Sequence, residues 1–397
     1  MTDAILVVNA GSSSIKFKLY RIEGAGLGLE LGGALDGIGS RPCLKVSGGD
    51  GAVLIERRFT QAEIPNATAA QKAIGDWLLA HMRVAIVAVG HRVVHGGMTF
   101  AEPVRIDDAV MAELTSFIPL APLHQLSNLE PIRVLRERRP DLPQVACFDT
   151  AFHRGHPELS DRFALPRVLY DEGVRRYGFH GLSYEYVAGA LRTIAPEIAN
   201  GRVIIAHLGS GASVCAIRAG KSIESTLGFT ALDGLPMGTR SGSLDPGVVL
   251  HLIEQKGMSA HQVGEMLYRE SGLLGLSGIS NDVRELEASG DPRARMALDF
   301  FGQRVAQAVA SLAVTLGGID ALVFTAGIGE HSASVRADVV ARLGWCGLAL
   351  DEEANARHAG NVGAAASRAA ILVVPTDEEL MIARHTLRLL GRVPATS

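Results

Sequence analysis

The chain has 397 residues, of which 47% are hydrophobic and 20% are charged, and its formal net charge is −4. This length exceeds the usual size of one domain, so we expect two domains. A weakly acidic chain of ordinary composition gives no indication of a nucleic-acid-binding protein. The four cysteines form no Cys-x-x-Cys pair, which argues against a zinc knuckle or a redox motif, and Cys147 and Cys215 lie in apolar runs that predict buried thiols.

The start of the chain enters a predicted strand with Asp3 ahead of it, so we expect no signal peptide. The longest apolar helix candidate, residues 305–316, is too short to span a bilayer and is interrupted by Gln307 and Ser311. We therefore expect a soluble cytoplasmic protein without a membrane partner.

The first predicted element is a strand, a Gly-Ser turn and a second strand. Residues 5–8 are an apolar run, and residues 15–20 alternate between apolar and polar side chains, which is typical of a half-buried strand. The turn at residues 9–14 exposes backbone N–H groups and hydroxyls that suit phosphate oxygens, with Lys16 beside it. Asn9 is placed to hold a phosphate or a metal-bound water. The alternative is an ordinary hairpin with a solvated serine turn.

The next part of the chain alternates between strands and helices after a run of short strands. The expected elements are short strands over 28–59, a helix over 67–82, a strand over 85–89, helices over 107–117 and 125–139, and a strand over 144–148. This order predicts a mixed sheet flanked by helices.

A charged, proline-containing segment, 154–176, precedes a predicted helix over 183–195 with Ser183 as its N-cap and Glu185 in its first turn. Strands over 203–206 and 214–217 then repeat the opening arrangement. In this repeat His207 corresponds to Asn9, Gly209 to Gly11 and Ser210 to Ser12. The repeat suggests two halves with similar cores.

The remainder of the chain is predicted to alternate between helices and strands. The expected elements are helices over 245–256, 259–270, 293–316 and 332–343, strands over 321–325 and 370–374, and a closing helix from Asp377.

Two partial motifs are set aside. Gly220-Lys221-Ser222 matches the end of a phosphate-binding P-loop, but Cys215 stands where the motif requires glycine, so Gly220 is expected in a hairpin turn. His91 and His95 have an i, i+4 spacing, but no Glu follows His91 and the run is strand-like, so a zinc site is not supported.

Glycine turns follow apolar strands at residues 9–14, 207–213 and 326–331, and a predicted helix follows the third turn. Phosphate groups bind well at such turns and at helix N-termini. Arg92 and Asp149 stand at strand ends, and Arg240 lies in a loop of small residues, 238–242, where it can move or reach. This combination fits phosphoryl transfer, which needs positive charge around the transferred group.

Each of these residues also has a structural alternative when it is considered alone. An isolated arginine is most often part of a surface salt bridge, and His180 and His207 are compatible with hydrogen-bonded core histidines. Only the combination with the glycine turns favours a site.

Seven motifs together resemble acetate kinases, in the expected order and over nearly the whole chain. They are Asn9-Ala-Gly-Ser-Ser-Ser-Ile-Lys16, Gly90-His-Arg-Val-Val-His-Gly-Gly97, Phe148-Asp-Thr-Ala-Phe-His153, Arg176-Tyr-Gly-Phe-His-Gly181, Met237-Gly-Thr-Arg-Ser-Gly242, Phe324-Thr-Ala-Gly-Ile-Gly-Glu330 and Pro375-Thr-Asp-Glu-Glu-Leu380.

The resemblance implies an α/β protein with two related RNase H-like domains, each with a central mixed sheet, and a nucleotide cleft between them, as in actin, sugar kinases and chaperone ATPases. It implies an actin-like domain over 1–150, on which the closing helix 380–397 packs, and a nucleotide-binding and dimerisation domain over 151–379. It further implies a homodimer that uses ATP or ADP with Mg²⁺, or Mn²⁺ in its place, and acetate or another short carboxylate.

The resemblance also implies a role for each matching residue. The catalytic residues would be Arg92, Asp149, His180 and Arg240, of which His180 would stabilise the transition state, and the Mg²⁺ ligands would be Asn9 and Glu378. Arg92 would also hold the carboxylate, in a pocket formed with Val94, Leu123, His124, Phe179 and Ala231. The nucleotide would bind to Ser12, Ser14, Lys16, His207, Leu208, Gly209, Ser210, Gly211, Asp282, Val283, Arg284, Gly327, Ile328, Gly329, Glu330 and His331.

The chain departs from the family pattern at several positions. Tyr184 replaces a usual His, Ala231 a usual Pro, Ser210 and His331 a usual Asn each, Ser243 a usual Asp, and Gln125-Leu126 a usual Asn-Pro. Three functions therefore stay open: reversible phosphorylation of acetate by ATP, which we favour, the same reaction with propionate or butyrate, and a nucleotide-driven module without kinase activity.

Overall fold

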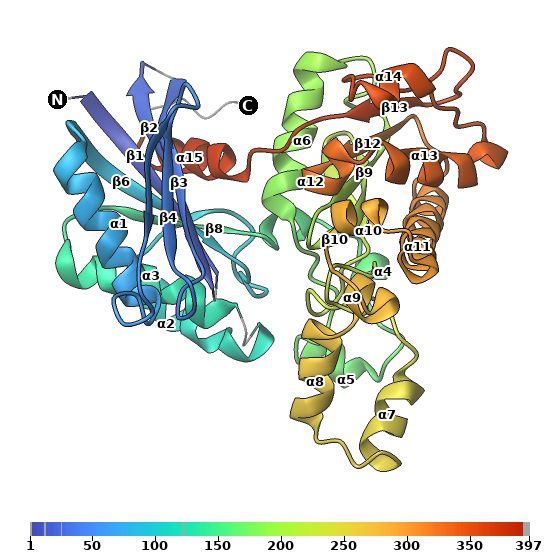
Figure 1. Cartoon of the computed structure of the whole chain (residues 1–397), viewed down its shortest axis with the longest axis horizontal. Coiled ribbons are helices and arrows are strands. Elements are labelled where there is room, and N and C mark those ends of the chain that lie inside the picture. Colours follow the sequence, from blue (N-terminus) through green and yellow to red (C-terminus); the bar gives the residue numbers. More distant parts are fainter. Residues whose placement is uncertain (1, 12, 25, 122–123, 392–397) are drawn as a thin grey trace. The chain divides into compact units, whose positions relative to one another are not determined.

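The computed structural model describes residues 2–11, 13–24, 26–121 and 124–391. The chain forms two compact units (Figure 1). The first unit comprises Met1–Phe152 and Asp377–Ser397, and the second comprises His153–Thr376. The chain returns to the first unit between Thr376 and Asp377, shortly before the boundary expected from the sequence, so that Glu378 belongs to the first unit.

The first unit is built on an eight-stranded sheet with the order β5-β4-β3-β2-β1-β6-β8-β7. Its strands are β1 (Thr2–Ala10), β2 (Ser14–Glu23), β3 (Gly26–Asp36), β4 (Cys43–Gly48), β5 (Val53–Arg58), β6 (Val84–Val93), β7 (Val104–Arg105) and β8 (Gln144–Phe148). Its helices are α1 (Ala67–His81), α2 (Asp108–Ser116), α3 (Gln125–Arg138) and α15 (Glu378–Leu389). Strands β1 to β5 form an antiparallel meander, whereas β6 runs parallel to β1 and β8 runs parallel to β6.

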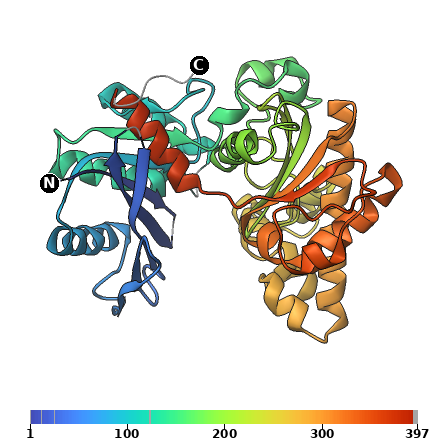
Figure 2. The ribbon, with the colours of Figure 1, turned by 90° about the horizontal axis from the view of Figure 1, so that it is seen from above.

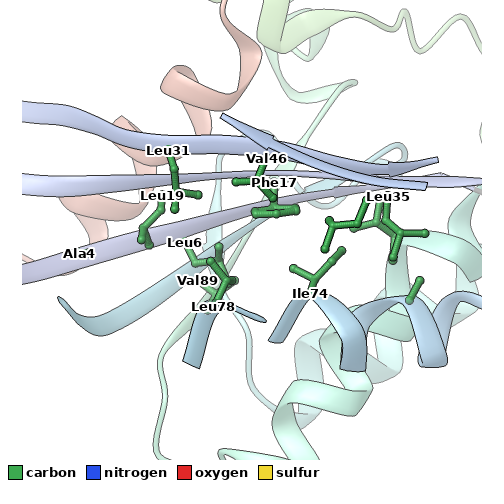
Figure 3. Packing of buried hydrophobic residues seen from close by; sticks show 14 of the residues in the cluster. Ala4, Leu6, Phe17, Leu19, Leu31, Leu35, Val46, Ile74, Leu78 and Val89 are labelled. Atoms are coloured by element: carbon green, nitrogen blue, oxygen red, sulfur yellow. The ribbon is translucent and has the colours of Figure 1, made fainter. Parts of the chain in front are cut away.

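Helices cover both faces of the central strands of this sheet. On one face, Phe17, Leu19 and Leu31 of the sheet pack with Ile74 and Leu78 of α1 (Figure 3). Helix α1 begins where the sequence predicts it, because the side chain of Asn66 accepts a hydrogen bond from the Ala69 N–H. Helix α15 covers the opposite face, although it lies about 300 residues from α1 in the chain (Figure 2).

Gly90 permits the close approach of α15 to β6. A Cβ atom on Gly90 would collide with Thr386 Oγ1 and would lie 2.6 Å from Ile382 Cγ2, both on α15. The neighbouring residue Val89 belongs to the core on the other face, as the alternation of a strand requires. The absence of a side chain at Gly90 is therefore a packing requirement.

The second unit is built on a five-stranded sheet with the order β11-β10-β9-β12-β13. Its strands are β9 (Arg202–Leu208), β10 (Ala212–Arg218), β11 (Lys221–Ser225), β12 (Ala321–Thr325) and β13 (Ala370–Val373). Its helices are α4 (Glu158–Asp161), α5 (Arg167–Asp171), α6 (Gly181–Ile194), α7 (Pro246–Glu254), α8 (Ala260–Arg269), α9 (Gly272–Ser277), α10 (Val283–Ala288), α11 (Pro292–Leu316), α12 (Ala326–His331), α13 (Ala333–Arg342) and α14 (Glu352–Ala356). Helices α6 and α11 cover opposite faces of this sheet (Figures 1 and 2). Within the described ranges, none of the helices combines the length and apolar character needed to cross a membrane.

The two sheets share one core topology. In each, an antiparallel hairpin (β1–β2 or β9–β10) is followed by two strands parallel to its first strand (β6 and β8, or β12 and β13). Asn9 and His207 occupy equivalent places at the ends of β1 and β9. The predicted α/β fold with two related mixed-sheet cores is therefore confirmed.

Two local predictions in the second unit were wrong. Helix α6 begins at Gly181, with His180 rather than Ser183 at its N-cap, and Ser183 lies buried inside the helix. Residues 326–331 form the short helix α12 rather than a turn that only precedes a helix. By contrast, Cys147 and Cys215 are buried as predicted, and Gly220 lies in the β10–β11 hairpin turn.

We expect Gly90→Ala to destabilise the first unit by about 1–3 kcal/mol, because the added methyl group would push α15 away from β6. The matched control is Gly75→Ala in α1, where a Cβ would meet no atom within 4 Å and where alanine is the better helix former by about 0.5–1 kcal/mol. Urea unfolding, followed through Trp77 in a Trp345→Phe background, measures both changes. Equal or greater stability of Gly90→Ala would contradict this packing.

Candidate active site

Arg92 and Asp149 form the central ion pair of the first unit. Arg92 lies near the end of β6 and Asp149 follows β8, and the parallel pairing of these strands brings the two residues together. The Arg92 Nε donates to Asp149 Oδ1 at 3.0 Å and Nη2 donates to Oδ2 at 2.5 Å. Only 2% of the Asp149 side chain is exposed. This two-bond geometry fixes the plane of the guanidinium group.

Burial opposes the charged form of Arg92, but the carboxylates of Asp149 and Glu378 outweigh it and raise the pKa of the guanidinium group. The arginine therefore stays cationic. Its side chain is 23% exposed, so part of the group remains accessible. A charged, oriented and partly accessible guanidinium group is suited to binding a carboxylate or phosphoryl oxygen.

Asn9 links Arg92 to the start of α15. The Asn9 Oδ1 accepts a hydrogen bond from Arg92 Nη1 at 3.3 Å, and its Nδ2 donates to Glu379 Oε1 at 3.5 Å. The Glu378 carboxylate lies 3.9 Å from Arg92 Nε. Arg92 thus contacts both predicted metal ligands, Asn9 and Glu378, which lie far apart in the sequence.

The start of α15 carries three consecutive acidic residues. Asp377 caps the helix by accepting from the Leu380 N–H, and Lys18 Nζ lies 2.8 Å from Asp377 and 3.3 Å from Glu379. Burial, and then the carboxylates of Asp149 and Glu379, raise the pKa of Glu378 to about 7 in spite of Arg92. Acidic side chains are favourable at a helix N-terminus.

Lys18, Asp377 and Glu379 are site residues that the sequence analysis missed. Their signal was present, because Lys18 lies on the polar face of a predicted strand and the two acids flank Glu378 within one motif. The resemblance implies that Asn9 and Glu378 meet at one metal ion, but it did not show that Lys18 pairs with the two neighbouring acids.

The first glycine turn is closed by a hydrogen bond from the Gly11 N–H to the Ser14 carbonyl at 2.8 Å. Lys16 is exposed and pairs with Asn9 across the β1–β2 ladder. Ser12 and Leu123, two further predicted site residues, lie outside the described residues.

Nearby, Asn128 joins two strand ends, because its Nδ2 donates to the Ala10 carbonyl at 2.6 Å and its Oδ1 accepts from the Val94 N–H at 2.9 Å. Val94 is buried and His124 is half-buried at the N-cap of α3. Gln125, which departs from the family pattern, is buried, and its amide donates to the carbonyls of His95 and Leu114. This substitution is therefore accommodated by backbone hydrogen bonds.

In the second unit, His180 and His207 stack with ring centroids 4.2 Å apart and an interplanar angle of 19°. His207 is the penultimate residue of β9, and His180 precedes α6 in the left-handed region, at φ 58°. Each ring has a serine at Nδ1: Ser213 Oγ lies 2.8 Å from His180 Nδ1, and Ser183 Oγ lies 2.8 Å from His207 Nδ1. The Nδ1 edge of each ring is therefore held by a hydrogen bond with a serine.

The opposite edges of the two rings face the second glycine turn. A Cβ on Gly211 would lie 3.1 Å from His180 Nε2 and 3.9 Å from Arg240 Nη1, and a Cβ on Gly209 would lie 3.8 Å from His207 Nε2. Three nitrogen groups therefore converge on a turn that carries no side chain at either glycine. Leu208, between the strand and the turn, is buried, whereas Ser210 is exposed.

The loop of Arg240 is held by backbone hydrogen bonds rather than free to move. The N–H groups of Ser271, Leu273 and Leu274, around the start of α9, donate to the carbonyls of Thr239, Met237 and Gly238. The Gly238 N–H donates to the Ser210 carbonyl, which ties the loop to the glycine turn. The Arg240 Nη1 donates to the Ala231 carbonyl at 2.9 Å. Phe179, another predicted pocket residue, is buried.

The predicted nucleotide residues 282–284 lie at the start of α10, and residues 327–331 make up most of α12. Asp282 caps α10 and pairs with the exposed Arg284, which lowers the pKa of Asp282 to about 2, while Val283 is buried. In α12, Gly329 is buried, Ile328 is half-buried, and Gly327 and His331 are exposed. Glu330 Oε1 accepts from the Thr376 N–H at 3.3 Å.

Helix α12 is anchored by a buried arginine that the sequence analysis missed. Arg336 Nη1 donates to the carbonyls of Gly329 and Glu330, both at 2.9 Å, and its other nitrogens contact Asn355 and His358. Burial lowers the pKa of Arg336. No local pattern distinguishes this arginine from a surface residue of an amphipathic helix.

Comparison with known proteins identifies the family. The model of the acetokinase family matches residues 4–384. An acetate kinase from Nitrobacter hamburgensis is 57% identical over 98% of this chain and 96% of its own length, and one from Rhizobium meliloti is 53% identical over 98% of this chain and 99% of its own length.

Two solved structures are also similar. A propionate kinase from Francisella tularensis superimposes with a TM-score of 0.90 at 37% identity, over 97% of this chain and 99% of the other. An acetate kinase from Porphyromonas gingivalis superimposes with a TM-score of 0.87 at 37% identity, over 98% of this chain and 100% of the other. The expectation of a kinase that acts on a carboxyl group is thereby confirmed, and the chain belongs to the acetokinase family.

Proposed function

We propose that this protein transfers the γ-phosphoryl group of ATP to acetate, reversibly, giving acetyl phosphate and ADP. The observation that carries this proposal is the convergence of Arg240, His180 and His207 on the Gly209–Gly211 turn. Phosphoryl transfer depends on positioning and on positive or hydrogen-bonding groups around the transferred oxygens, without a covalent protein nucleophile. The acetate kinases that are more than half identical to this chain support the choice of acceptor.

Arg92 would bind the carboxylate of the acceptor and the transferring phosphoryl group. Its bidentate pair with Asp149 supports this role, because it leaves the guanidinium group charged, oriented and partly exposed. Asp149 would act as the catalytic carboxylate by holding Arg92 in place. Removing Asp149 would leave a cation without its partner in a desolvated position.

We propose that both units contribute to the nucleotide site. The hairpin turn with Ser12, Ser14 and Lys16 would bind phosphates, since Lys16 is exposed beside it. The proposed binding residues of the second unit are His207, Leu208, Gly209, Ser210, Gly211, Asp282, Val283, Arg284, Gly327, Ile328, Gly329, Glu330 and His331. The second unit would also carry the dimer interface of a cytoplasmic homodimer, a proposal that rests on the family resemblance.

Mg²⁺ fits the residues at the start of α15. The described residues contain no group of three or more His, Cys, Asp or Glu side chains suited to a metal ion, and Mg²⁺ usually takes one or two protein oxygen ligands together with waters and substrate phosphates. Asn9 Oδ1 and the Glu378 carboxylate supply such oxygens. The bound ion, or Mn²⁺ in its place, would neutralise charge on the phosphates of the nucleotide.

The acceptor pocket would be formed by Val94, Leu123, His124, Phe179 and Ala231. Ala231 is connected to the reaction site, since its carbonyl accepts a hydrogen bond from Arg240. The similarity to a propionate kinase supports propionate as a second candidate acceptor.

Trapping of the acyl phosphate as a hydroxamate, with ATP and acetate, propionate or butyrate, tests the proposed activity. Formation of acetyl hydroxamate supports the kinase. Hydrolysis of ATP without any hydroxamate would instead favour a nucleotide-driven module.

We expect Asn9→Ala and Glu378→Ala to raise the Mg²⁺ concentration needed for half-maximal activity at least roughly tenfold, because each removes an oxygen contact of the ion. The measurement is a Mg²⁺ titration of the initial rate at fixed ATP. Glu352→Ala, at an exposed position in the first turn of α14, is the control and should leave the titration unchanged. Unshifted titrations for both site variants would remove Asn9 and Glu378 as ligands.

We expect Arg240→Ala to lower kcat by ~10³–10⁵, the range for an arginine that stabilises phosphoryl charge in the transition state. The KM for ATP should change much less. The matched control is Arg269→Ala on α8, whose side chain is 61% exposed and pairs with Glu265. If kcat stays at the wild-type level, Arg240 has no role in the transition state.

We expect propionate to be used within about tenfold of acetate in kcat/KM, a difference of ~1.4 kcal/mol. Alanine at position 231 presents one methyl group where a proline would present three ring carbons, and one methylene in an apolar pocket changes discrimination by only ~1–3 kcal/mol. Ala231→Pro, which keeps the carbonyl that contacts Arg240, should disfavour propionate. Strong rejection of propionate by the wild type, together with an unchanged ratio in the variant, would show that residue 231 does not set chain length.

A further inference from the structure

Ser213 lies between Tyr184 and His180 in the second unit. The Ser213 Oγ is 2.5 Å from Tyr184 Oη and 2.8 Å from His180 Nδ1. The Ser213 and Tyr184 residues are fully buried, at 0% exposed. Ser213 is in β10 and Tyr184 is in α6, so the contact joins the helix that follows His180 to the hairpin that carries the second glycine turn.

The number of hydroxyl hydrogens on Tyr184 and Ser213 determines which residue donates in each of these hydrogen bonds. A serine hydroxyl has one hydrogen, so Ser213 can donate either to His180 or to Tyr184. Among the residues that the structure describes, Ser213 is the only hydrogen-bond partner of Tyr184 Oη. If Ser213 donated to Tyr184, the phenolic hydrogen would be buried without an acceptor, which is unfavourable. Tyr184 therefore donates to Ser213. Ser213 in turn donates to His180 Nδ1, because a serine that accepted from both groups would leave its own buried hydrogen without an acceptor.

A nitrogen that accepts a hydrogen bond carries no hydrogen, so the neutral His180 ring must be protonated at Nε2. Burial raises the pKa of Tyr184 well above its ordinary value, which keeps the phenol protonated and able to donate. The Nε2 edge faces the place where a Cβ of Gly211 would lie, 3.1 Å away, close to the Arg240 guanidinium group. The hydrogen on Nε2 consequently points toward the turn where the phosphoryl group is proposed to bind.

The neighbouring ring is held in the same way. Ser183, which is fully buried in α6, lies 2.8 Å from His207 Nδ1. Among the described residues, His207 Nδ1 is the hydrogen-bond partner of the Ser183 hydroxyl, so donation to Nδ1 satisfies this group. Both stacked rings would then present Nε2–H to the turn at Gly209 and Gly211.

We propose that Tyr184 and Ser213 are positioning residues that form a one-way hydrogen-bond relay and hold His180 in its Nε2–H tautomer. The tautomer follows from this network alone, whereas its value for catalysis rests on the proposed function. The chain has tyrosine at a position where acetate kinases usually have histidine. Through this relay Tyr184 would act on the proposed reaction site, so the tyrosine at this position would not be a neutral change in the core.

The test uses the full-length protein labelled with ¹⁵N-histidine and solid-state NMR of the ring nitrogens, with His180→Gln to assign the signals of His180. We expect the wild-type His180 to show a protonated Nε2 and an unprotonated Nδ1. Tyr184→Phe keeps the ring and removes only the oxygen, and it should populate the Nδ1–H tautomer, since Ser213 loses its donor. Tyr186→Phe, two residues further along α6, is the matched control and should leave the signals of His180 unchanged.

The effect of the relay on the reaction rate is measured separately from the tautomer of His180. We expect Tyr184→Phe to lower kcat about tenfold, or ~1.4 kcal/mol, with little change in the KM for ATP. Ser213→Ala should have a similar effect, and the double variant should be no worse than either single variant, because both remove the same relay.

The outcomes distinguish the relay from the proposed function. A protonated Nδ1 in the wild type, or unchanged signals in both Tyr184→Phe and Ser213→Ala, would overturn the relay even if the protein is an active kinase. If the tautomer shifts as expected but no acyl phosphate forms, the relay stands and the proposed function fails.

Discussion

Parallel pairing of strands is the constraint that places the candidate site residues in each of the two units. Because β6 runs parallel to β1 and β8 runs parallel to β6, the ends of three strands lie at one edge of the first sheet, and Asn9, Arg92 and Asp149 emerge there. In α/β sheets this carboxyl edge is the usual place for ligands. In the second sheet, the parallel pairing of β9 with β12 places His207 beside Thr325 in the same way. A shift of register by one residue would turn these side chains to the opposite face.

Buried and half-buried charge is the second common feature of the two units, and three such charges are matched locally. Arg92 is matched by Asp149 and Lys18 by the acids at the start of α15, whereas Arg336 is held by carbonyl and amide oxygens and a histidine nitrogen. Charges in such positions add little net stability, but the loss of one partner is costly. These pairings instead fix the orientation of the charged side chains. The guanidinium plane of Arg92 is fixed by Asp149, and Arg336 fixes the short helix α12.

The kinase and the nucleotide-driven module differ in the groups that surround the phosphate turns. A module needs only the turns, whereas a carboxylate kinase needs cations that bind the acceptor and the transferred group. Under the proposed function each unit would provide one such cation, Arg92 held by Asp149 or Arg240 held by the Ala231 carbonyl. This is the structural basis for preferring the kinase, and it agrees with membership of the acetokinase family.

The amino-acid sequence by itself determined the strands and glycine turns, the repeated hairpin, the family, and the residues at strand ends such as Asn9 and His207. These features depend on local periodicity and on short motifs, which a sequence displays directly. The family resemblance implied that the closing helix packs on the first unit. Only the tertiary structure decided that Asn9 contacts Glu379, which is 370 residues away, and that Lys18 pairs with the acids at the start of α15. It also decided that α6 begins at Gly181, and that Ser213 lies between Tyr184 and His180. Such contacts join side chains from separate elements, and their geometry arises from packing and burial that no local pattern records.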